Sequence, residues 1–244
     1  MNDDLSVRVN DDLSVRVNDD LSVRVNDDLS AGVNADLPAG AWPWLHDLAR
    51  WIGSWLWFLV FRLHLHGRGR VPRTGPVVVV ANHSAFVDGP LLFGLFRRRA
   101  VFWVKQEMFV GPLGWVLRRL GQVPVRRGTA DRTPLTAGLA VLRGGGLVAI
   151  FPEGTRGTGD VTAVQQGAAW LARTSGAVVV PVVCRGTRRP DGARRRFRPR
   201  VDVMVGEPVT IPAGGGRAGL AAATEAVRAE LAAAVRELDT RRSS

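Results

Sequence analysis

Residues 76–88 read Pro-Val-Val-Val-Val-Ala-Asn-His-Ser-Ala-Phe-Val-Asp, and this stretch decides the fold. Its first half is a short β-branched run after a Gly-Pro turn, which predicts a buried strand over 76–81. The apolar segment over 90–96 then predicts a helix. In folds that alternate strands and helices, ligands bind beyond the carboxyl ends of the strands. The polar residues between these two elements are therefore candidates for chemistry.

The same alternation continues along the rest of the chain. Further strands are predicted over 100–105, 122–125, 147–151, 177–183 and 201–205, and further helices over 114–120, 133–143, 164–174 and 217–238. Such alternation predicts a single α/β domain with a central, mostly parallel or mixed sheet flanked by helices. We assign the body of this domain to residues 67–216 and its C-terminal helix to residues 217–244.

The head of the chain, residues 1–40, is a decaying tandem repeat of Asn-Asp-Asp-Leu-Ser-Val-Arg-Val. A period of eight fits neither a helix nor the usual solenoid repeats, and three apolar residues per unit supply little core. We therefore expect disorder over 1–40, with a small stacked or calcium-binding β-roll as the alternative. The Asp pairs would suit calcium, but the unit lacks the glycines that such a turn needs.

Composition narrows the class of partner. The 244 residues carry a net charge of +11, while the nine Asp and three Arg of residues 1–40 give −6, so the remainder carries +17. A basic body favours nucleic acid, anionic lipid or phosphorylated small molecules. The single cysteine, Cys184, excludes an intrachain disulfide and favours a reducing compartment. The sequence contains no helix-turn-helix, zinc-finger or RNA-recognition signature, which disfavours nucleic acid.

Residues 41–66 hold five of the eight tryptophans. The uncharged run over 51–61 would span roughly 16 Å as a helix, short of the ~30 Å hydrocarbon core. Tryptophan favours the lipid headgroup level, and Arg50 and Arg62 flank the run to meet anionic lipid. We expect an amphipathic helical segment lying in a membrane interface. The alternatives are a helix docked on the domain core and a tilted true span.

His83 and Asp88 lie five residues apart across the turn that follows the first strand. A carboxylate can hold one imidazole nitrogen protonated and leave the other free as a general base. The alternative interpretation is structural, because Asp88 before Gly89-Pro90 is also a good helix N-cap and His83 could be a turn histidine.

The strand over 147–151 is followed by a tight turn, Phe151-Pro-Glu-Gly-Thr-Arg156, which gathers a carboxylate, a hydroxyl and a guanidinium. These groups suit phosphate, because Glu153 can orient Arg156 while the guanidinium and backbone N–H groups take the anion. A surface turn with an ion pair is the alternative. Arg126 and Arg127 place two further guanidiniums at the end of the strand over 122–125.

Together these segments resemble the 1-acyl-sn-glycerol-3-phosphate acyltransferase family. The His-x4-Asp block at His83, the Pro-Val-Arg-Arg segment ending at Arg127, the complete Phe-Pro-Glu-Gly-Thr-Arg block and a hydrophobic strand with a central Pro181 occur in the family's order. The resemblance covers about residues 67–209 and implies the family's α/β fold.

The resemblance also implies the activity and its residues. His83 and Asp88 would be the catalytic dyad, the substrate's phosphate would be bound by Arg127, Glu153, Gly154, Thr155 and Arg156, and Pro181 would belong to an acyl or donor pocket. The reaction would move an acyl chain from acyl-CoA or acyl carrier protein, as co-substrate, to 1-acyl-sn-glycerol-3-phosphate. Lyso-ornithine lipid and other lysophospholipids are alternative acceptors.

No cofactor or metal is expected for this chemistry. The expected partners are the thioester donor, the lysophospholipid acceptor and an anionic membrane surface, with the enzyme peripheral or monotopic on the cytoplasmic face of the cell membrane. Two other classes of function stay open from sequence alone. A membrane-bound acyl thioesterase would use the same His and Asp to activate water, and a nucleic-acid-binding protein would use the same charge.

Overall fold

The computed structural model describes residues 36–126, 132–151, 166–189, 192, 197–211 and 216–243. The repeat up to residue 35 lies outside this range, so the expected disorder there stays a prediction. Residues 36–40, expected to be disordered with it, belong instead to the folded unit of residues 36–244. Leu37 is buried in the core, and Asp36 pairs with Arg99 at 3.2 Å.

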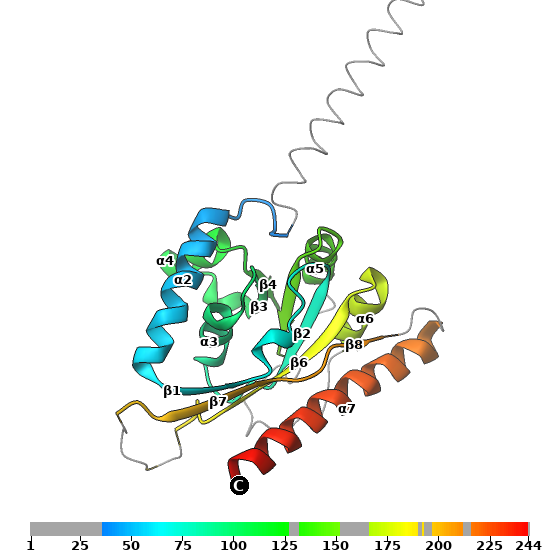
Figure 1. Ribbon diagram of the computed structural model, residues 1–244. Coiled ribbons are helices and arrows are strands. Elements are labelled where there is room, and N and C mark those ends of the chain that lie inside the picture. Colours follow the sequence, from blue (N-terminus) through cyan, green and yellow to red (C-terminus); the bar gives the residue numbers. More distant parts are fainter. Residues whose placement is uncertain are drawn as a thin grey trace, which may run out of the picture. The chain divides into compact units, whose positions relative to one another are not determined.

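Strands and helices alternate as the sequence predicts (Figure 1). The elements are α2 (Pro43–Val60), β1 (Arg62–His66), the short 3-10 helix η1 (Arg68–Arg70), β2 (Val77–Ala81), α3 (Asp88–Leu95), β3 (Val101–Lys105), η2 (Gln106–Met108), α4 (Gly111–Arg119), β4 (Val123–Val125), α5 (Thr133–Arg143), β5 (Leu147–Ile150), α6 (Gln166–Ser175), β6 (Val178–Arg185), β7 (Arg200–Val205), β8 (Val209–Thr210) and α7 (Gly216–Ser243).

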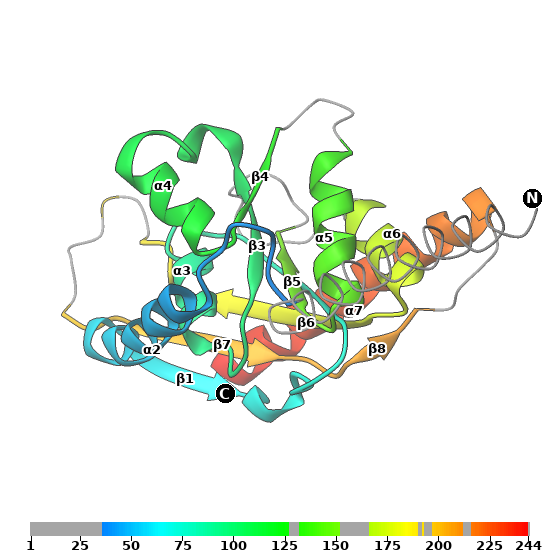
Figure 2. The ribbon, with the colours of Figure 1, turned by 90° about the horizontal axis from the view of Figure 1, so that it is seen from above.

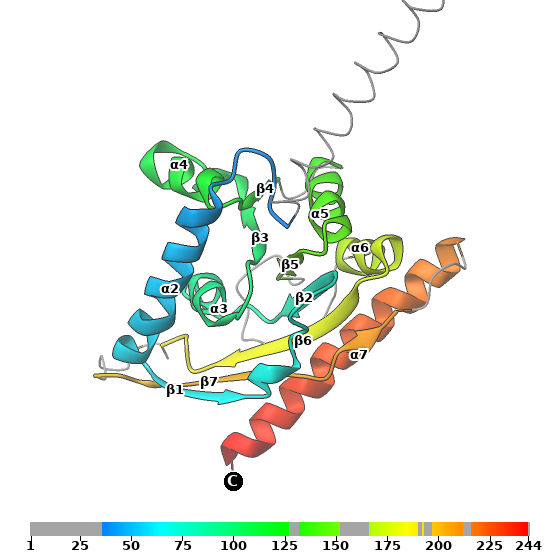
Figure 3. The ribbon, with the colours of Figure 1, turned by 45° about the horizontal axis from the view of Figure 1, so that its top comes forward.

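The strands form one mixed sheet in the order β1-β7-β6-β2-β5-β3-β4, with β8 beside β6. β6, β2, β5, β3 and β4 run parallel, so their carboxyl ends share one edge. β7 pairs antiparallel with β6, and β1 runs parallel to β7 (Figure 2). β2 therefore sits between β6 and β5, at the centre of the sheet (Figure 3).

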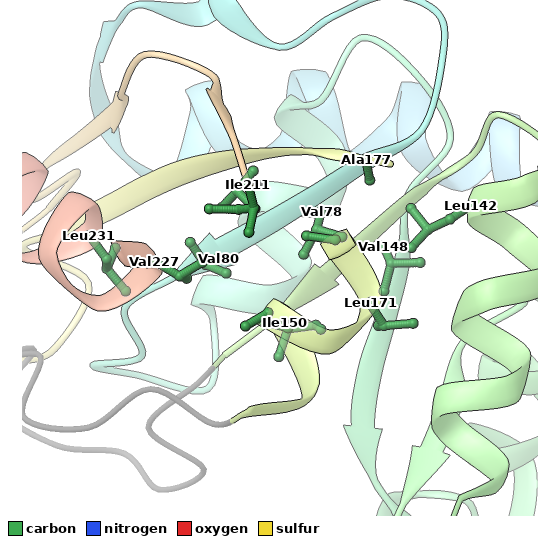
Figure 4. Close-up of a cluster of buried hydrophobic side chains, with 14 of the residues drawn as sticks. Val78, Val80, Leu142, Val148, Ile150, Leu171, Ala177, Ile211, Val227 and Leu231 are labelled. Carbon is green, nitrogen blue, oxygen red and sulfur yellow. The ribbon is translucent and has the colours of Figure 1, made fainter. Parts of the chain in front are cut away.

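β2 is buried on both faces, which explains its continuous β-branched run. Val78 and Val80 face the core under α5, α6 and α7, whereas Val77 and Val79 face the core under α3 and the end of α2. Figure 4 shows Val78, Val80, Val148 and Ile150 meeting Leu171 and Leu231 in the first of these cores.

The helical segment expected over 41–66 is shorter than predicted. The helix α2 ends at Val60, and residues 62–66 form the edge strand β1 instead. Leu63 and Leu65 alternate there with the more exposed Arg62 and His64, which is the period-two pattern of a half-buried strand. The two-residue strand β8 is a second element that the sequence did not predict.

α2 packs directly on α3, the helix that begins with Asp88. The closest approach is at Gly53 and Gly94, where a methyl group added to Gly94 would come within 2.7 Å of the Gly53 carbonyl carbon. Near the other end of α3, the indole N–H of Trp57 donates to the Pro90 carbonyl at 3.0 Å. The tryptophan-rich helix α2 is thus packed with direct backbone contact against α3, the helix that carries Asp88.

Candidate active site

The turn after β2 is fixed to β6 by Asn82, a residue that the sequence analysis did not single out. Its buried side chain accepts the backbone N–H of Cys184 at 2.7 Å and donates to the Cys184 carbonyl at 3.0 Å. The amide thereby continues the hydrogen bonding between the two strands by one residue. A buried amide placed directly at the end of an apolar strand was the signal available in the sequence.

The structure brings His83 and Asp88 together, as their spacing predicts. His83 Nδ1 lies 3.3 Å from Asp88 Oδ2, and the Asp88 side chain is fully buried. The same Oδ2 accepts the backbone N–H groups of Ser84 and Ala85, each at 2.7 Å. These three donors hold the carboxylate under the turn through charge-assisted hydrogen bonds, which are stronger than hydrogen bonds between neutral groups.

The interpretation of Asp88 as a helix N-cap is wrong. Asp88 is the first helical residue of α3, and the preceding cap residue, Val87, makes no side-chain capping bond. The carboxylate instead turns back to bind the loop that holds His83.

This arrangement sets the chemistry of the imidazole. A carboxylate acceptor at Nδ1 favours the tautomer with the proton on Nδ1 and leaves Nε2 with its lone pair. Among the described residues no group hydrogen-bonds to Nε2, and the His83 side chain keeps 15% exposure. The pair can therefore accept a proton from a substrate that approaches from the carboxyl edge of the sheet.

Phe151, at the end of β5, covers the imidazole. The rings of His83 and Phe151 stack with centroids 4.3 Å apart and planes inclined by 27°. Phe151 begins the Phe-Pro-Glu-Gly-Thr-Arg block, so the two sequence motifs meet in space through this contact. In the sequence, Phe151 is part of the motif without a role of its own.

Two alternative nucleophiles lack the required surroundings. Cys184 is fully buried, and this burial, with the nearby Asp88 carboxylate, raises the pKa of its thiol well above the ordinary value. Ser84 Oγ accepts a hydrogen bond from the Asn82 amide at 3.3 Å, and no described histidine contacts it. Neither side chain is activated for attack.

The other predicted site residues fall into two groups. Arg127, Glu153, Gly154, Thr155 and Arg156 lie outside the described residues. Pro181 lies within β6 and is buried, packed against Gly206 and paired with Val80 of β2. Among the described residues there is no cluster of His, Cys, Asp and Glu that could hold a metal ion.

One surface of the molecule is unusually apolar. α2 leaves Trp44, Trp51, Trp55 and Leu59 more than half exposed. α4 lies beside the start of α2 (Figure 3) and adds the exposed Trp115. The Trp115 ring meets Trp42 edge to face. Within the described part of the chain, no helix has the length and apolarity needed to cross a bilayer.

Fold and site together define a class: α/β proteins that place a histidine base, oriented by a buried carboxylate, at the carboxyl edge of a largely parallel sheet. A sequence model of the acyltransferase family matches residues 62–185, which include both motifs. The chain belongs to the acyltransferase family.

Its relatives share a narrow set of names. The chain is 31% identical over 147 residues to a chloroplastic 1-acyl-sn-glycerol-3-phosphate acyltransferase of Arabidopsis thaliana, covering 58% of this chain and 41% of that protein. It is 26% identical over 148 residues to the Bacillus subtilis 1-acyl-sn-glycerol-3-phosphate acyltransferase, covering 59% and 72%. The lyso-ornithine lipid O-acyltransferase of Pseudomonas aeruginosa is 34% identical over 146 residues, covering 58% and 54%.

The fold also matches a solved structure. The 1-acyl-sn-glycerophosphate acyltransferase PlsC from Thermotoga maritima superposes with a TM-score of 0.64 at 26% identity, covering 80% of this chain and 79% of that one. This likeness confirms the predicted class of a single α/β domain with a mixed sheet flanked by helices.

Proposed function

We propose that this protein is an O-acyltransferase that moves a fatty acyl chain from an acyl thioester to the hydroxyl of a lysophospholipid. The acceptor we favour is 1-acyl-sn-glycerol-3-phosphate, and the product is then phosphatidic acid. The observation that carries the proposal is the His83–Asp88 pair at 3.3 Å, which uses Nδ1 of a histidine whose side chain keeps 15% exposure. Most of the named relatives act on this acceptor according to their names.

The pair supports a direct transfer without a covalent enzyme intermediate. The acceptor oxygen forms a bond to the thioester carbonyl carbon while its proton passes to His83 Nε2. The carbon–sulfur bond then breaks, and the imidazolium returns the proton to the departing sulfur, which leaves as a free thiol. The Asp88 carboxylate stabilises the imidazolium between these steps. General-base help of this kind contributes on the order of 10²- to 10⁴-fold in rate.

The acceptor's phosphate is assigned to the side of the sheet beyond β5 and β4. Arg127 follows β4, and the segment with Glu153, Gly154, Thr155 and Arg156 follows β5. Because β5 is the neighbour of β2, its carboxyl end adjoins the turn that holds His83. The resemblance gives these residues the phosphate, and the stacking of Phe151 on His83 supports the juxtaposition.

The apolar surface of α2 and α4 supports association with a membrane, which we propose to be the cytoplasmic face of the cell membrane. The lysophospholipid acceptor resides in the bilayer, whereas the acyl thioester donor is dissolved in the aqueous phase. Exposed tryptophans and leucines suit the headgroup level, and the basic body suits anionic lipid. A peripheral or monotopic association brings both substrates to one edge of the enzyme.

The test compares His83→Ala with wild-type enzyme, using palmitoyl-CoA and lysophosphatidic acid and measuring phosphatidic acid formed. We expect kcat to fall by at least about 10²-fold with the thermal midpoint unchanged. His64→Ala is the matched control, because His64 is exposed on β1. Near-normal turnover by a folded His83→Ala protein would contradict the role of His83 as the general base. Release of free fatty acid by the wild-type protein, without acylated lipid, would contradict acyl transfer to a lysophospholipid.

Lyso-ornithine lipid is the second candidate acceptor, favoured by the 34% identity to the Pseudomonas enzyme of that name. Side-by-side kcat/KM values for lysophosphatidic acid and lyso-ornithine lipid decide between them. A higher value for lysophosphatidic acid supports the proposal, and the reverse order overturns the choice of acceptor while leaving the acyl transfer intact.

A further inference from the structure

An open pocket of about 370 Å³ lies beside the turn that holds the candidate base. Ser84, Ala85 and Phe86 form one wall, and Thr187, Arg188 and Arg189, which follow β6, form the other. None of these lining residues is among those assigned to the acceptor, which follow β4 and β5 in the sequence. None of the six lining residues carries a negative charge.

The charge of this pocket is not neutralised within the described structure. Arg188 and Arg189 are exposed, and no described carboxylate pairs with either. The arginines nearby behave differently, since Arg185 binds Asp239 and Arg200 binds Asp202. Thr187 Oγ1 is buried and also has no hydrogen-bond partner among the described residues. Two guanidiniums and a hydroxyl form a set of donors that suits phosphate.

The strand order indicates which substrate these three donor groups could bind. β2 lies between β6 and β5 and runs parallel to both, so the His83 turn has the carboxyl end of β5 on one side and the carboxyl end of β6 on the other. The acceptor's phosphate is only a few atoms from its reacting hydroxyl and can occupy one side. The opposite side is then left for the second substrate, which also carries phosphate.

We propose that the Thr187–Arg189 pocket binds the phosphate groups of the acyl thioester donor, meaning the phosphopantetheine arm and, in coenzyme A, its diphosphate. This inference rests on the proposed function. The exposed ring of Phe86 gives the arm an apolar wall beside the catalytic turn, and the two guanidiniums hold its anionic end. The donor thus approaches from the β6 side and the acceptor from the β5 side.

The kinetic test uses the double variant Arg188→Ala/Arg189→Ala. We expect KM for palmitoyl-CoA to rise at least about tenfold, with KM for the lysophospholipid and kcat within about twofold. Arg143→Ala/Arg217→Ala is the matched control, because it removes the same charge from exposed positions at α5 and α7, before β5 and after β8. A rise in the acceptor's KM instead, or no rise in either KM, overturns the proposal.

A second arm varies the donor. S-palmitoylpantetheine lacks every phosphate, so the wild-type enzyme should prefer palmitoyl-CoA, and Arg188→Ala/Arg189→Ala should lose most of that preference. Arg188→Lys/Arg189→Lys keeps the charge and should recover part of it. An undiminished preference in the alanine variant contradicts the pocket's role.

Direct binding separates this proposal from the proposed function. Calorimetric titration with coenzyme A alone needs no turnover, and thermal midpoints verify that the variants are folded. If the wild-type protein transfers no acyl group but binds coenzyme A through these arginines, the pocket stands and the proposed function fails. If transfer proceeds and coenzyme A binds the alanine variant as tightly as the wild-type protein, the pocket fails and the function stands.

Discussion

The imidazole of His83 is restrained by two neighbours. Asp88 fixes its edge through Nδ1, and Phe151 covers one of its faces at 4.3 Å between centroids. A general base contributes most when its lone pair already points along the path of the proton, because misplacement by about 1 Å can cost 10²-fold. We therefore expect Phe151 to act as a positioning residue that limits rotation of the ring.

Replacement of Phe151 should lower kcat without a matching loss of stability. We expect Phe151→Ala to reduce kcat by about tenfold, since the imidazole gains freedom to leave the productive orientation. Phe151→Trp, which keeps an aromatic face, should recover most of the rate, whereas Phe151→Leu should not. Steady-state kinetics together with thermal midpoints test this. Equal kcat values for the leucine and tryptophan variants would show that Phe151 contributes only through packing.

The residues that carry the chemistry could be predicted from the sequence only in part. The spacing of His83 and Asp88 across a strand-to-helix turn was sufficient to predict their contact. The partners of Asn82 and Phe151 could not be predicted in the same way, because each residue makes its contact across the sheet, Asn82 with β6 and Phe151 from the end of β5. Their roles depend on which strands are neighbours, and local patterns do not contain that information.

At the scale of elements, His46 joins α2 to the rest of the domain. Its Nδ1 lies 2.8 Å from the Leu120 carbonyl, at the end of α4, and its Nε2 accepts the backbone N–H of Ala100, before β3, at 3.3 Å. The bond from Ala100 needs the neutral imidazole, because a protonated Nε2 has no lone pair to accept with, whereas Nδ1 can donate to the Leu120 carbonyl in either state. Burial lowers the pKa of His46 below 6.5, because the charged form loses its hydration.

The sign of the pH effect follows from this direction. A depressed pKa in the folded state means that His46 stabilises the fold above its unfolded pKa, and that this stabilisation is lost as the pH falls below about 6.5. We expect His46→Gln to lower the free energy of unfolding by about 1–2 kcal/mol at pH 8. The deficit should shrink toward pH 5.

Urea titrations at pH 8, 6.5 and 5 measure the effect. His64→Gln is the control, because His64 is exposed on β1 and should leave the pH dependence unchanged. A deficit for His46→Gln that is constant with pH would mean that the histidine contributes only through packing.

The elements themselves were largely predictable. Each strand predicted from an apolar run is present, including β2, β5 and β6, and the helix expected over 133–143 has those bounds. The failures occurred where polar and apolar residues alternate over a few positions. The residues of β1 were predicted to belong to the tryptophan-rich helical segment, because their leucines continue the apolar composition of α2. The spacing of apolar residues nevertheless changes from a period of 3.6 to a period of 2 after Phe61.

At the scale of the whole molecule, we expect the exposed apolar surface and the basic body to act together in binding a membrane. Isolated exposed apolar residues are ordinary in soluble proteins, but a cluster of tryptophans on one helix is not. Trp51, Ile52, Trp55, Leu56 and Leu59 line one shallow hollow on α2. We take this surface as the part of the enzyme that enters the headgroup layer.

Trp51→Ser/Trp55→Ser should therefore weaken binding to vesicles of phosphatidylglycerol and phosphatidylcholine by at least about tenfold, because two large apolar rings no longer leave water. Vesicle co-sedimentation measures the loss. Turnover of a short-chain, water-soluble acceptor should stay within twofold of wild type, which serves as the control. Unchanged sedimentation would show that this surface does not meet lipid.

The contact between Gly53 and Gly94 has a mechanical consequence. Packed helices are normally separated by a layer of side chains, which can change rotamer and absorb small displacements. No side chain separates α2 from α3 at this point, because a methyl group on Gly94 would come within 2.7 Å of the Gly53 backbone. A displacement of α2 is therefore transmitted directly to α3, the helix that begins at Asp88, with little of it absorbed by side-chain rearrangement.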